Sequence, residues 1–139
     1  MSELYESHVS QEVFAPVVGR YSDDGATAIC SAILAHHPGQ RFEVAIDDRE
    51  AAGIGRSLAE LWDSTGGEIY YLGDWHTHPG GISRYSAIDK TTALARAADA
   101  AAKAPQFIML ISGTDGLSCS IATREGDFME LHRLRGGFK

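Results

Sequence analysis

Residues 68–89 read EIYYLGDWHTHPGGISRYSAID, and this stretch decides the fold. Its first part, EIYYLGDWH at 68–76, is rich in aromatic and aliphatic residues, which is typical of a buried β-strand. Pro79 and the two glycines after it prevent the strand from continuing. The residues from about Ser86 onward are rich in alanine, the best helix former. The stretch therefore predicts a strand, a turn and a helix in succession.

The rest of the chain predicts strands on both sides of this unit. Strands are expected at 13–20, 26–35, 41–46, 106–112, 117–123 and 127–134, and helices at 48–64 and 86–103. Each helix precedes a strand, so the crossover pattern occurs twice. The predicted fold class is α/β of the mixed α+β kind, with one central mixed sheet flanked by helices.

Length and charge narrow the possible partners. The 139 residues fit one domain spanning 1–139. A net charge of −7 argues against nucleic acid, because phosphate binding needs a basic patch. The sequence shows no signal peptide and no apolar run long enough for a bilayer, so a cytoplasmic protein without a membrane partner is expected. Cys30 and Cys119 have no CxxC partner and are expected to be reduced core thiols.

The histidines near the end of strand 68–76 have the spacing of a metal site. Side chains two residues apart in a strand share a face, so His76 and His78 are expected to project together. Ser86 begins the following helix, and Asp89 lies three residues later on the same side. If loop 79–85 folds back, Asp89 can complete the three protein ligands of a catalytic zinc, which leaves the fourth position to water.

The same residue types also have ordinary structural roles. A serine at a helix start is commonly an N-cap, and an aspartate in the first turn commonly complements the helix dipole. The residues alone therefore leave the metal site and the structural interpretation both open. Two other zinc enzyme classes are disfavoured, because the H-x-E…P-C-x-x-C signature of deaminases and the H-E-x-x-H signature of thermolysin-like proteases are missing.

His76-Thr-His78-Pro79, six residues, and then Ser86-Ala-Ile-Asp89 resemble the JAMM motif, H-x-H-P-x6-S-x-x-D. This is the motif of the JAB/MPN (Mov34/MPN/PAD-1) zinc metalloproteases, whose fold is similar to that of cytidine deaminases. The resemblance implies that His76, His78 and Asp89 hold one Zn²⁺ with water as fourth ligand. It also implies that Ser86 stabilises the oxyanion of the intermediate.

The family's general base is a glutamate in a pattern similar to E-x-x-G-x-L-x-G. Residues 12–19, EVFAPVVG, place Glu12 and Gly19 at that spacing, with alanine and valine at the family's intermediate glycine and leucine positions. The resemblance implies that Glu12 accepts the proton of the water and later passes it to the leaving amine. Glu3 and Glu6 are the alternatives if the alignment shifts.

Members of this family cleave the bond after the C-terminal glycine of ubiquitin or ubiquitin-like proteins. The YLGDWHTHP segment and the short chain resemble compact bacterial members, which accompany activating and conjugating enzymes in antiphage or related systems. The resemblance thus implies a zinc isopeptidase that deconjugates or processes a ubiquitin-like protein. The alternatives are a peptidase that trims sulfur-carrier proteins and an inactive scaffold. Loop Gly80–Tyr85 is the expected substrate-contacting segment.

The C-terminal residues 133–137 spell RLRGG, the tail sequence of ubiquitin itself. A role as product mimic or self-substrate is conceivable. The simpler interpretation, which we favour, is a final strand that ends in a basic, glycine-rich tail.

Overall fold

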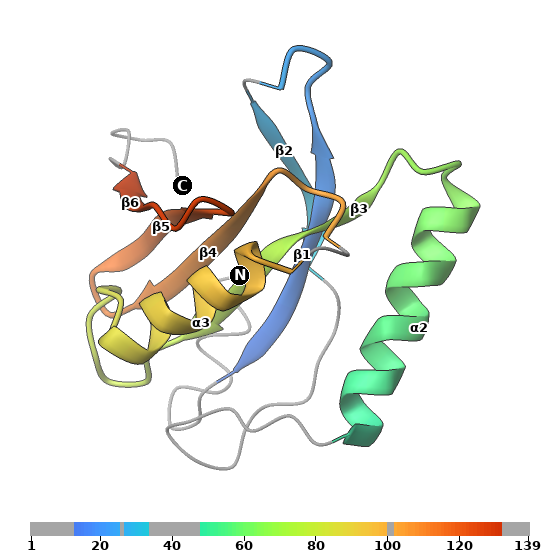
Figure 1. Cartoon of the computed structure of the whole chain (residues 1–139). Helices are drawn as coiled ribbons and strands as arrows, with labels where there is room; N and C mark the ends of the chain where they lie inside the picture. The colour runs from blue at the N-terminus through green and yellow to red at the C-terminus, as the bar shows by residue number, and fades with distance from the viewer. Residues whose placement is uncertain (1–12, 26, 34–47, 100–101, 132–139) are drawn as a thin grey trace.

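The computed structural model describes residues 13–25, 27–33, 48–99 and 102–131. In chain order its elements are β1 (Phe14–Tyr21), β2 (Ala28–Ile33), α2 (Asp48–Ser64), β3 (Tyr70–Thr77), α3 (Ala87–Ala97), β4 (Gln106–Gly113), β5 (Gly116–Thr123) and β6 (Phe128–Leu131). Within these residues the strands form one sheet of order β2-β1-β3-β4-β5-β6 (Figure 1). Only β3 and β4 pair in parallel, and the other neighbours are antiparallel. The predicted mixed α/β sheet is confirmed.

Helix α3 makes the crossover between the two parallel strands, because parallel neighbours cannot be joined by a tight hairpin. It runs across β4 and β5 on one face of the sheet (Figure 1). Its buried residues Ala93 and Ala97 pack there against Phe107, Met109 and Ile111. The small alanines let the helix approach closely. The alternation that turns every second residue of β4 toward α3 is the normal period of a strand.

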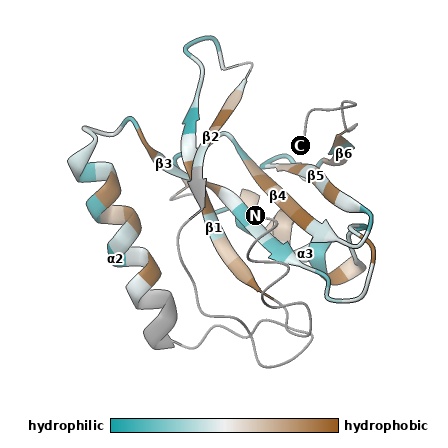
Figure 2. Cartoon of the chain, turned by 180° about the vertical axis from the view of Figure 1, so that it is seen from behind, coloured by the Kyte–Doolittle hydropathy of each residue, from teal (hydrophilic) through white to brown (hydrophobic). Residues whose placement is uncertain are grey.

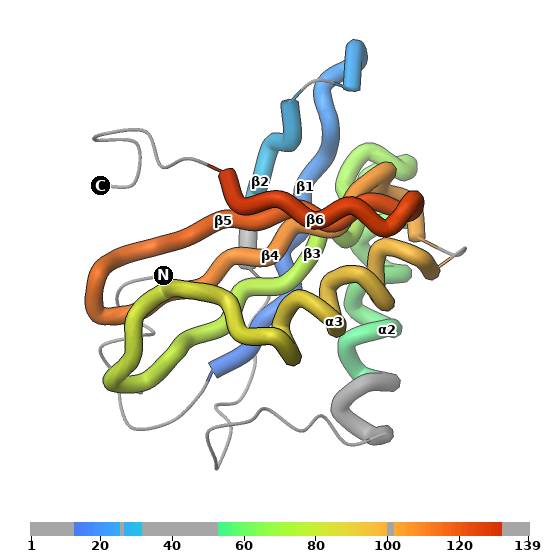
Figure 3. The backbone as a smooth tube through the Cα atoms, turned by 60° about the vertical axis from the view of Figure 1, so that its left-hand side comes forward, coloured from blue at the N-terminus to red at the C-terminus, as the bar shows by residue number. Residues whose placement is uncertain are grey.

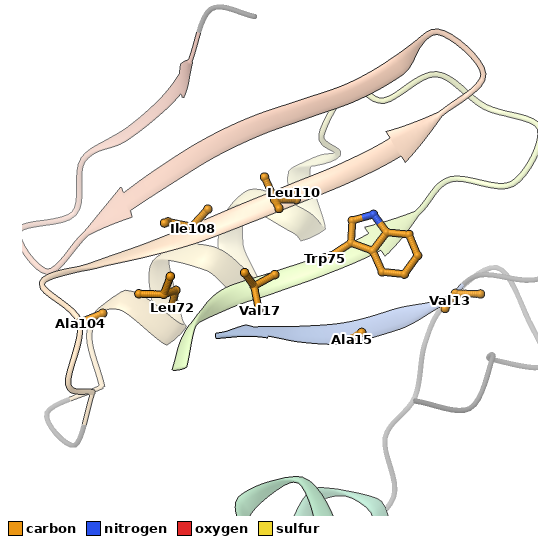
Figure 4. Close-up of a cluster of buried hydrophobic side chains, with 8 residues drawn as sticks. All are labelled: Val13, Ala15, Val17, Leu72, Trp75, Ala104, Ile108 and Leu110. Carbon is orange, nitrogen blue, oxygen red and sulfur yellow. The ribbon is translucent and has the colours of Figure 1, made fainter. Parts of the chain in front are cut away.

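The other face of the sheet carries a second buried cluster. Its members come from β1, β3, β4 and the flanking residues, namely Val13, Ala15, Val17, Leu72, Trp75, Ala104, Ile108 and Leu110 (Figure 4). Trp75 is fully buried, and its indole Nε1 donates to Ser112 Oγ at 2.8 Å. Residues 107–111 of β4 are all apolar and buried, because this strand is covered on both faces, and Figure 2 shows the strand as hydrophobic. Trp75 thus packs in the core, on the face of β3 opposite to His76.

A bulge in β3 changes which residues face α3. Val17 pairs with Gly73 and the next residue, Val18, pairs with Tyr71, so Leu72 has no opposing partner on β1. A bulge of this kind shifts the alternation by one residue and bends the strand. Tyr71 and Asp74 consequently lie on the α3 face together. A second irregularity lies in the pairing of β1 with β2, where Ser31 of β2 has no partner on β1. The sheet is strongly curled, so that β1–β2 and β4–β5 run at a steep angle to each other (Figure 3).

Most of the predicted helices and strands are present in the structure. The predicted end of the second helix is wrong. Helix α2 has the predicted bounds, whereas α3 ends at Ala97 instead of 103. Ala98 closes the helix by donating its N–H to Leu94 O. Alanine-rich composition favours helix at every position and so marks no end, but the chain must turn back here to enter β4. The Arg124 guanidinium donates to Ala102 O at 2.7 Å and holds this connection near the far end of β5.

The prediction of core thiols is also wrong for one cysteine. Cys30 is exposed and Cys119 is half-buried, and both are free. Cys30 lies on β2, the outermost of the described strands next to β1. Among the described strands, only β1 pairs with β2. The predicted strand 41–46 and the RLRGG tail lie outside the described residues. Among the described helices, none combines the length and the apolar character needed to cross a membrane.

Candidate metal centre

The two histidines lie where β3 ends, next to the start of β1 and the end of β4. Thr77, between them, is buried and binds Val13 in both directions: Val13 N donates to Thr77 Oγ1 at 2.9 Å, and Thr77 N donates to Val13 O at 3.0 Å. His78 N donates to Ser112 O of β4 at 2.9 Å. The His76 and His78 rings lie side by side, with centroids 5.2 Å apart. The backbone that carries both imidazoles is therefore fixed from two sides.

A tight turn reverses the chain directly after His78. Gly81 N donates to His78 O at 3.0 Å, which closes a four-residue β-turn over His78-Pro79-Gly80-Gly81. Proline is favoured at the second position of such a turn, and Gly80 has φ +70°, a conformation that glycine adopts without strain. This turn starts the return of the chain toward the sheet. Residues 78–81, HPGG, thus form the turn by which loop 79–85 folds back, as a metal site with Asp89 requires.

Ser86 and Asp89 form the N-terminal cap of α3. Ser86 Oγ accepts the Asp89 N–H at 3.1 Å, and Asp89 Oδ2 accepts the Ser86 N–H at 2.8 Å. This reciprocal pair is a capping box, which satisfies backbone N–H groups that the helix start would otherwise leave unpaired. The cap also fixes the direction of the Asp89 side chain.

The Asp89 carboxylate bridges the two imidazoles. Its Oδ1 lies 3.2 Å from His76 Nε2, and its Oδ2 lies 3.2 Å from His78 Nε2. One ligand atom from each of the three side chains falls within 4.8 Å of the others. Two ligands of a tetrahedral zinc at about 2.0–2.1 Å are separated by roughly 3.3 Å. The spacing therefore fits a small divalent cation.

The two imidazoles present their Nε2 atoms to this group. His78 Nδ1 lies 3.1 Å from the carbonyl oxygen of Ile82, which can only accept, so Nδ1 donates its hydrogen there and Nε2 is the ring atom left for a metal. His76 Nε2 is buried and makes no hydrogen bond with any described residue. A buried polar atom without a hydrogen bond is unusual in a native protein. Metal coordination would satisfy it, so the donor set fits a metal.

The charge state of Asp89 suits a ligand. Burial alone raises the pKa of its carboxyl, but the adjacent His76 and His78 imidazoles and the Ser86 backbone N–H outweigh burial and hold the pKa well below its usual range. Asp89 is therefore ionised at neutral pH. A carboxylate must be deprotonated to bind a metal.

A buried polar cluster behind the histidines escaped the sequence analysis. Asp74 is only 5% exposed and accepts the Tyr71 hydroxyl at 2.7 Å. Burial raises the pKa of the Asp74 carboxyl to about 6, against the opposing effects of Tyr71, the Arg96 guanidinium and His76. Arg96 belongs to the last turn of α3, so its charge links that helix to β3. The spacing Asp74-x-His76 in a strand is the signal that could have placed Asp74 on the histidine face.

The structure brings together four of the five residues predicted for the site. His76, His78, Ser86 and Asp89 meet at the carboxyl end of β3, while Glu12 lies outside the described residues. In loop 80–85, Ser83 is buried, whereas Ile82 is 54% exposed.

Comparison with known proteins identifies the family of this chain. The family model for prokaryotic homologs of the JAB domain matches residues 1–129. A relative named CD-NTase/cGAS isopeptidase, from Enterobacter hormaechei subsp. hoffmannii (strain UCI 50), is 29% identical over 129 residues, or 89% of this chain and 69% of the relative. The solution structure of protein DSY2949 from Desulfitobacterium hafniense matches with a TM-score of 0.48 and 18% identity, covering 100% of this chain and 96% of that one. Because the family model spans most of its sequence, this chain belongs to the prokaryotic homologs of the JAB domain.

Proposed function

We propose that this protein is a zinc-dependent isopeptidase or peptidase that hydrolyses the bond after the C-terminal glycine of a ubiquitin-like protein. The observation that carries the proposal is the meeting of His76, His78 and Asp89 within 4.8 Å. Three protein ligands are the number used by catalytic zinc, which keeps its fourth position for water. A structural zinc would normally have four.

Zinc held by these side chains would supply a Lewis acid and would lower the pKa of water to about 7. Ser86 is the oxyanion donor in this proposal. Its Oγ already accepts the Asp89 N–H, so the hydroxyl hydrogen remains available to donate to the carbonyl oxygen of the substrate. A donor aimed at developing negative charge is worth about 2.7–4 kcal/mol of barrier in comparable sites.

Glu12 is the proposed general base. The residue after it, Val13, is hydrogen-bonded to Thr77 in both directions, and Thr77 lies between the two histidines. Glu12 is bonded directly to Val13, and its sequence position makes it the acidic residue nearest to this hydrogen-bonded pair before β1. Glu12 would take the proton from water and deliver it to the leaving amine.

The proposed substrate is the extended tail of a ubiquitin-like protein, joined either to a target lysine or to a C-terminal extension. The similar relative is named CD-NTase/cGAS isopeptidase. An isopeptidase cleaves a conjugate, so this name favours deconjugation in a bacterial ubiquitin-like system over trimming of a sulfur carrier. Partners in such a system would include its activating and conjugating enzymes. The complete ligand set favours an enzyme over an inactive scaffold.

A cleavage assay tests this function. A bacterial ubiquitin-like protein would be fused through its terminal glycine to a reporter peptide and incubated with the zinc-loaded protein, and the products weighed by mass spectrometry. We expect one cut, directly after the terminal glycine, and none with His78→Ala. An uncut fusion and an equally uncut conjugate would refute the proposed activity. Cutting of a neighbouring sulfur-carrier precursor instead would select the alternative.

A further inference from the structure

The loop that follows the histidines is held by the turn between β4 and β5. Thr114 N donates to Gly81 O at 2.8 Å, and Asp115 Oδ1 accepts the Ser83 N–H at 2.7 Å. Ser118 Oγ donates to Ser83 O on the same strand pair. These bonds join residues more than thirty positions apart in the chain. Gly81 and Ser83, the residues on either side of Ile82, are therefore each hydrogen-bonded to the β4–β5 hairpin.

Gly113, the last residue of β4, brings the hairpin backbone into direct contact with this loop. A Cβ atom at this position would lie 2.4 Å from Ile82 C and 2.4 Å from Ser83 N. Real Cβ atoms do not approach backbone so closely, so only glycine allows the observed contact. The backbone of Ile82 and Ser83 is therefore in direct contact with the backbone of Gly113 at the end of β4.

Ile82 lies between the two fixed residues, and its carbonyl is the group that holds His78. Ile82 O lies 3.1 Å from His78 Nδ1, and this contact sets which ring nitrogen carries the hydrogen. Partners of this kind orient metal-binding imidazoles, and losing one typically costs about 10–100-fold in metal affinity. The position of the Ile82 carbonyl depends in turn on the bonds to Gly81 and Ser83.

We propose that Asp115 is a positioning residue for the metal ligand His78. Its carboxylate accepts the Ser83 N–H on one side of Ile82, while the Thr114 hydroxyl of the same turn donates to Gly81 O on the other side at 3.3 Å. Asp115 acts through the Ile82 carbonyl rather than by touching the metal. The inference rests on the metal centre of the proposed function. Asp115 itself is exposed, so its role is local and its replacement leaves both buried clusters intact.

Three variants separate this role from general effects. Asp115→Ala removes the acceptor, whereas Asp115→Asn keeps an oxygen that can accept the Ser83 N–H. Asp127→Ala, at an exposed aspartate in the β5–β6 turn, is the matched control. For each protein we would record the ¹⁵N resonances of the His78 ring without metal, the Zn²⁺ affinity by chelator competition, and the thermal unfolding of the metal-free form.

We expect the wild type, Asp115→Asn and Asp127→Ala to show one His78 tautomer with the hydrogen on Nδ1. Asp115→Ala should show a mixture of tautomers and a roughly tenfold weaker Zn²⁺ affinity, at the low end for such partners, with unfolding near that of the control. An Asp115→Ala protein with the wild-type tautomer and affinity would overturn the inference while leaving the zinc enzyme intact. A wild type that binds no zinc would refute the metal centre instead, and the metal-free ring spectra would still decide the role of Asp115.

Discussion

Ser86 and Asp89 hydrogen-bond each other in both directions, at 3.1 Å and 2.8 Å, and Asp89 simultaneously contacts both imidazoles. Asp89 therefore belongs both to the cap of α3 and to the three-residue group that could hold a metal. A capping box fixes the first turn of a helix, and here it also aims a carboxylate at the end of β3. Folding of this helix and assembly of the site are thus one local event.

Replacing Ser86 should separate capping from catalysis. Ser86→Ala removes both the cap and the oxyanion donor, so we expect about 1 kcal/mol less stability and a roughly 10²–10³-fold lower kcat. Ser86→Gly removes the same hydroxyl, but glycine caps nearly as well and costs only a few tenths of a kcal/mol. Urea unfolding and steady-state kinetics would measure the two effects. If Ser86→Gly keeps full turnover, Ser86 is a cap and no more.

Glu12→Gln should bind zinc as the wild type does and lose turnover by roughly 10²–10⁴-fold, because glutamine cannot accept the proton. Glu3→Gln and Glu6→Gln are the natural controls, since they neutralise the other acidic residues before β1. Both controls should remain active. Loss of activity in Glu6→Gln or Glu3→Gln, with an active Glu12→Gln, would move the base to that residue.

Ser112→Ala should lower the free energy of unfolding by about 1–3 kcal/mol, because it leaves the Trp75 indole N–H buried without an acceptor. The Trp75 side chain is fully buried, so its fluorescence reports the loss of packing directly. Ser57→Ala on the exposed side of α2 is the control and should cost much less. Equal stability of the two variants would show that the indole bond contributes nothing.

Ile88 precedes Asp89 on α3 and is 67% exposed, so its apolar side chain is accessible beside the candidate metal centre. If it contacts the substrate tail, Ile88→Ser should raise KM about tenfold, a loss of about 1.4 kcal/mol, with unchanged kcat and zinc content. Met129→Ser, at a residue 50% exposed on the β6 edge, should leave KM unchanged. An unaltered KM in Ile88→Ser would remove Ile88 from the substrate surface.

The sequence predicts well those features that depend on short-range patterns. The alternation and β-propensity of 68–76 predict β3, the HPGG segment predicts the turn, and Ser86 with Asp89 three residues later predicts the cap. Each involves residues close in the chain. For that reason the sequence could place His76, His78, Ser86 and Asp89 near one another before the fold was known.

Features that depend on distant parts of the chain could not be predicted in this way. Asp115 contacts Ser83 across 32 positions, and nothing in the residues around it indicates that pairing. The bulge at Leu72 depends on the register with β1, and strict alternation would have placed Leu72 on the same face as Asp74. The end of α3 depends on where β4 must begin, while the alanine-rich sequence continues to favour helix.

Removal and return of the metal test the central claim most directly. The metal-free protein, the same protein with one equivalent of Zn²⁺, and Asp89→Asn treated identically would each be incubated with the ubiquitin-like fusion. Asparagine keeps an oxygen for the cap but removes the negative charge at the metal. We predict no cut without metal, full cleavage after the terminal glycine once Zn²⁺ is restored, and no rescue of Asp89→Asn. Undiminished cleavage by the metal-free protein would contradict the account.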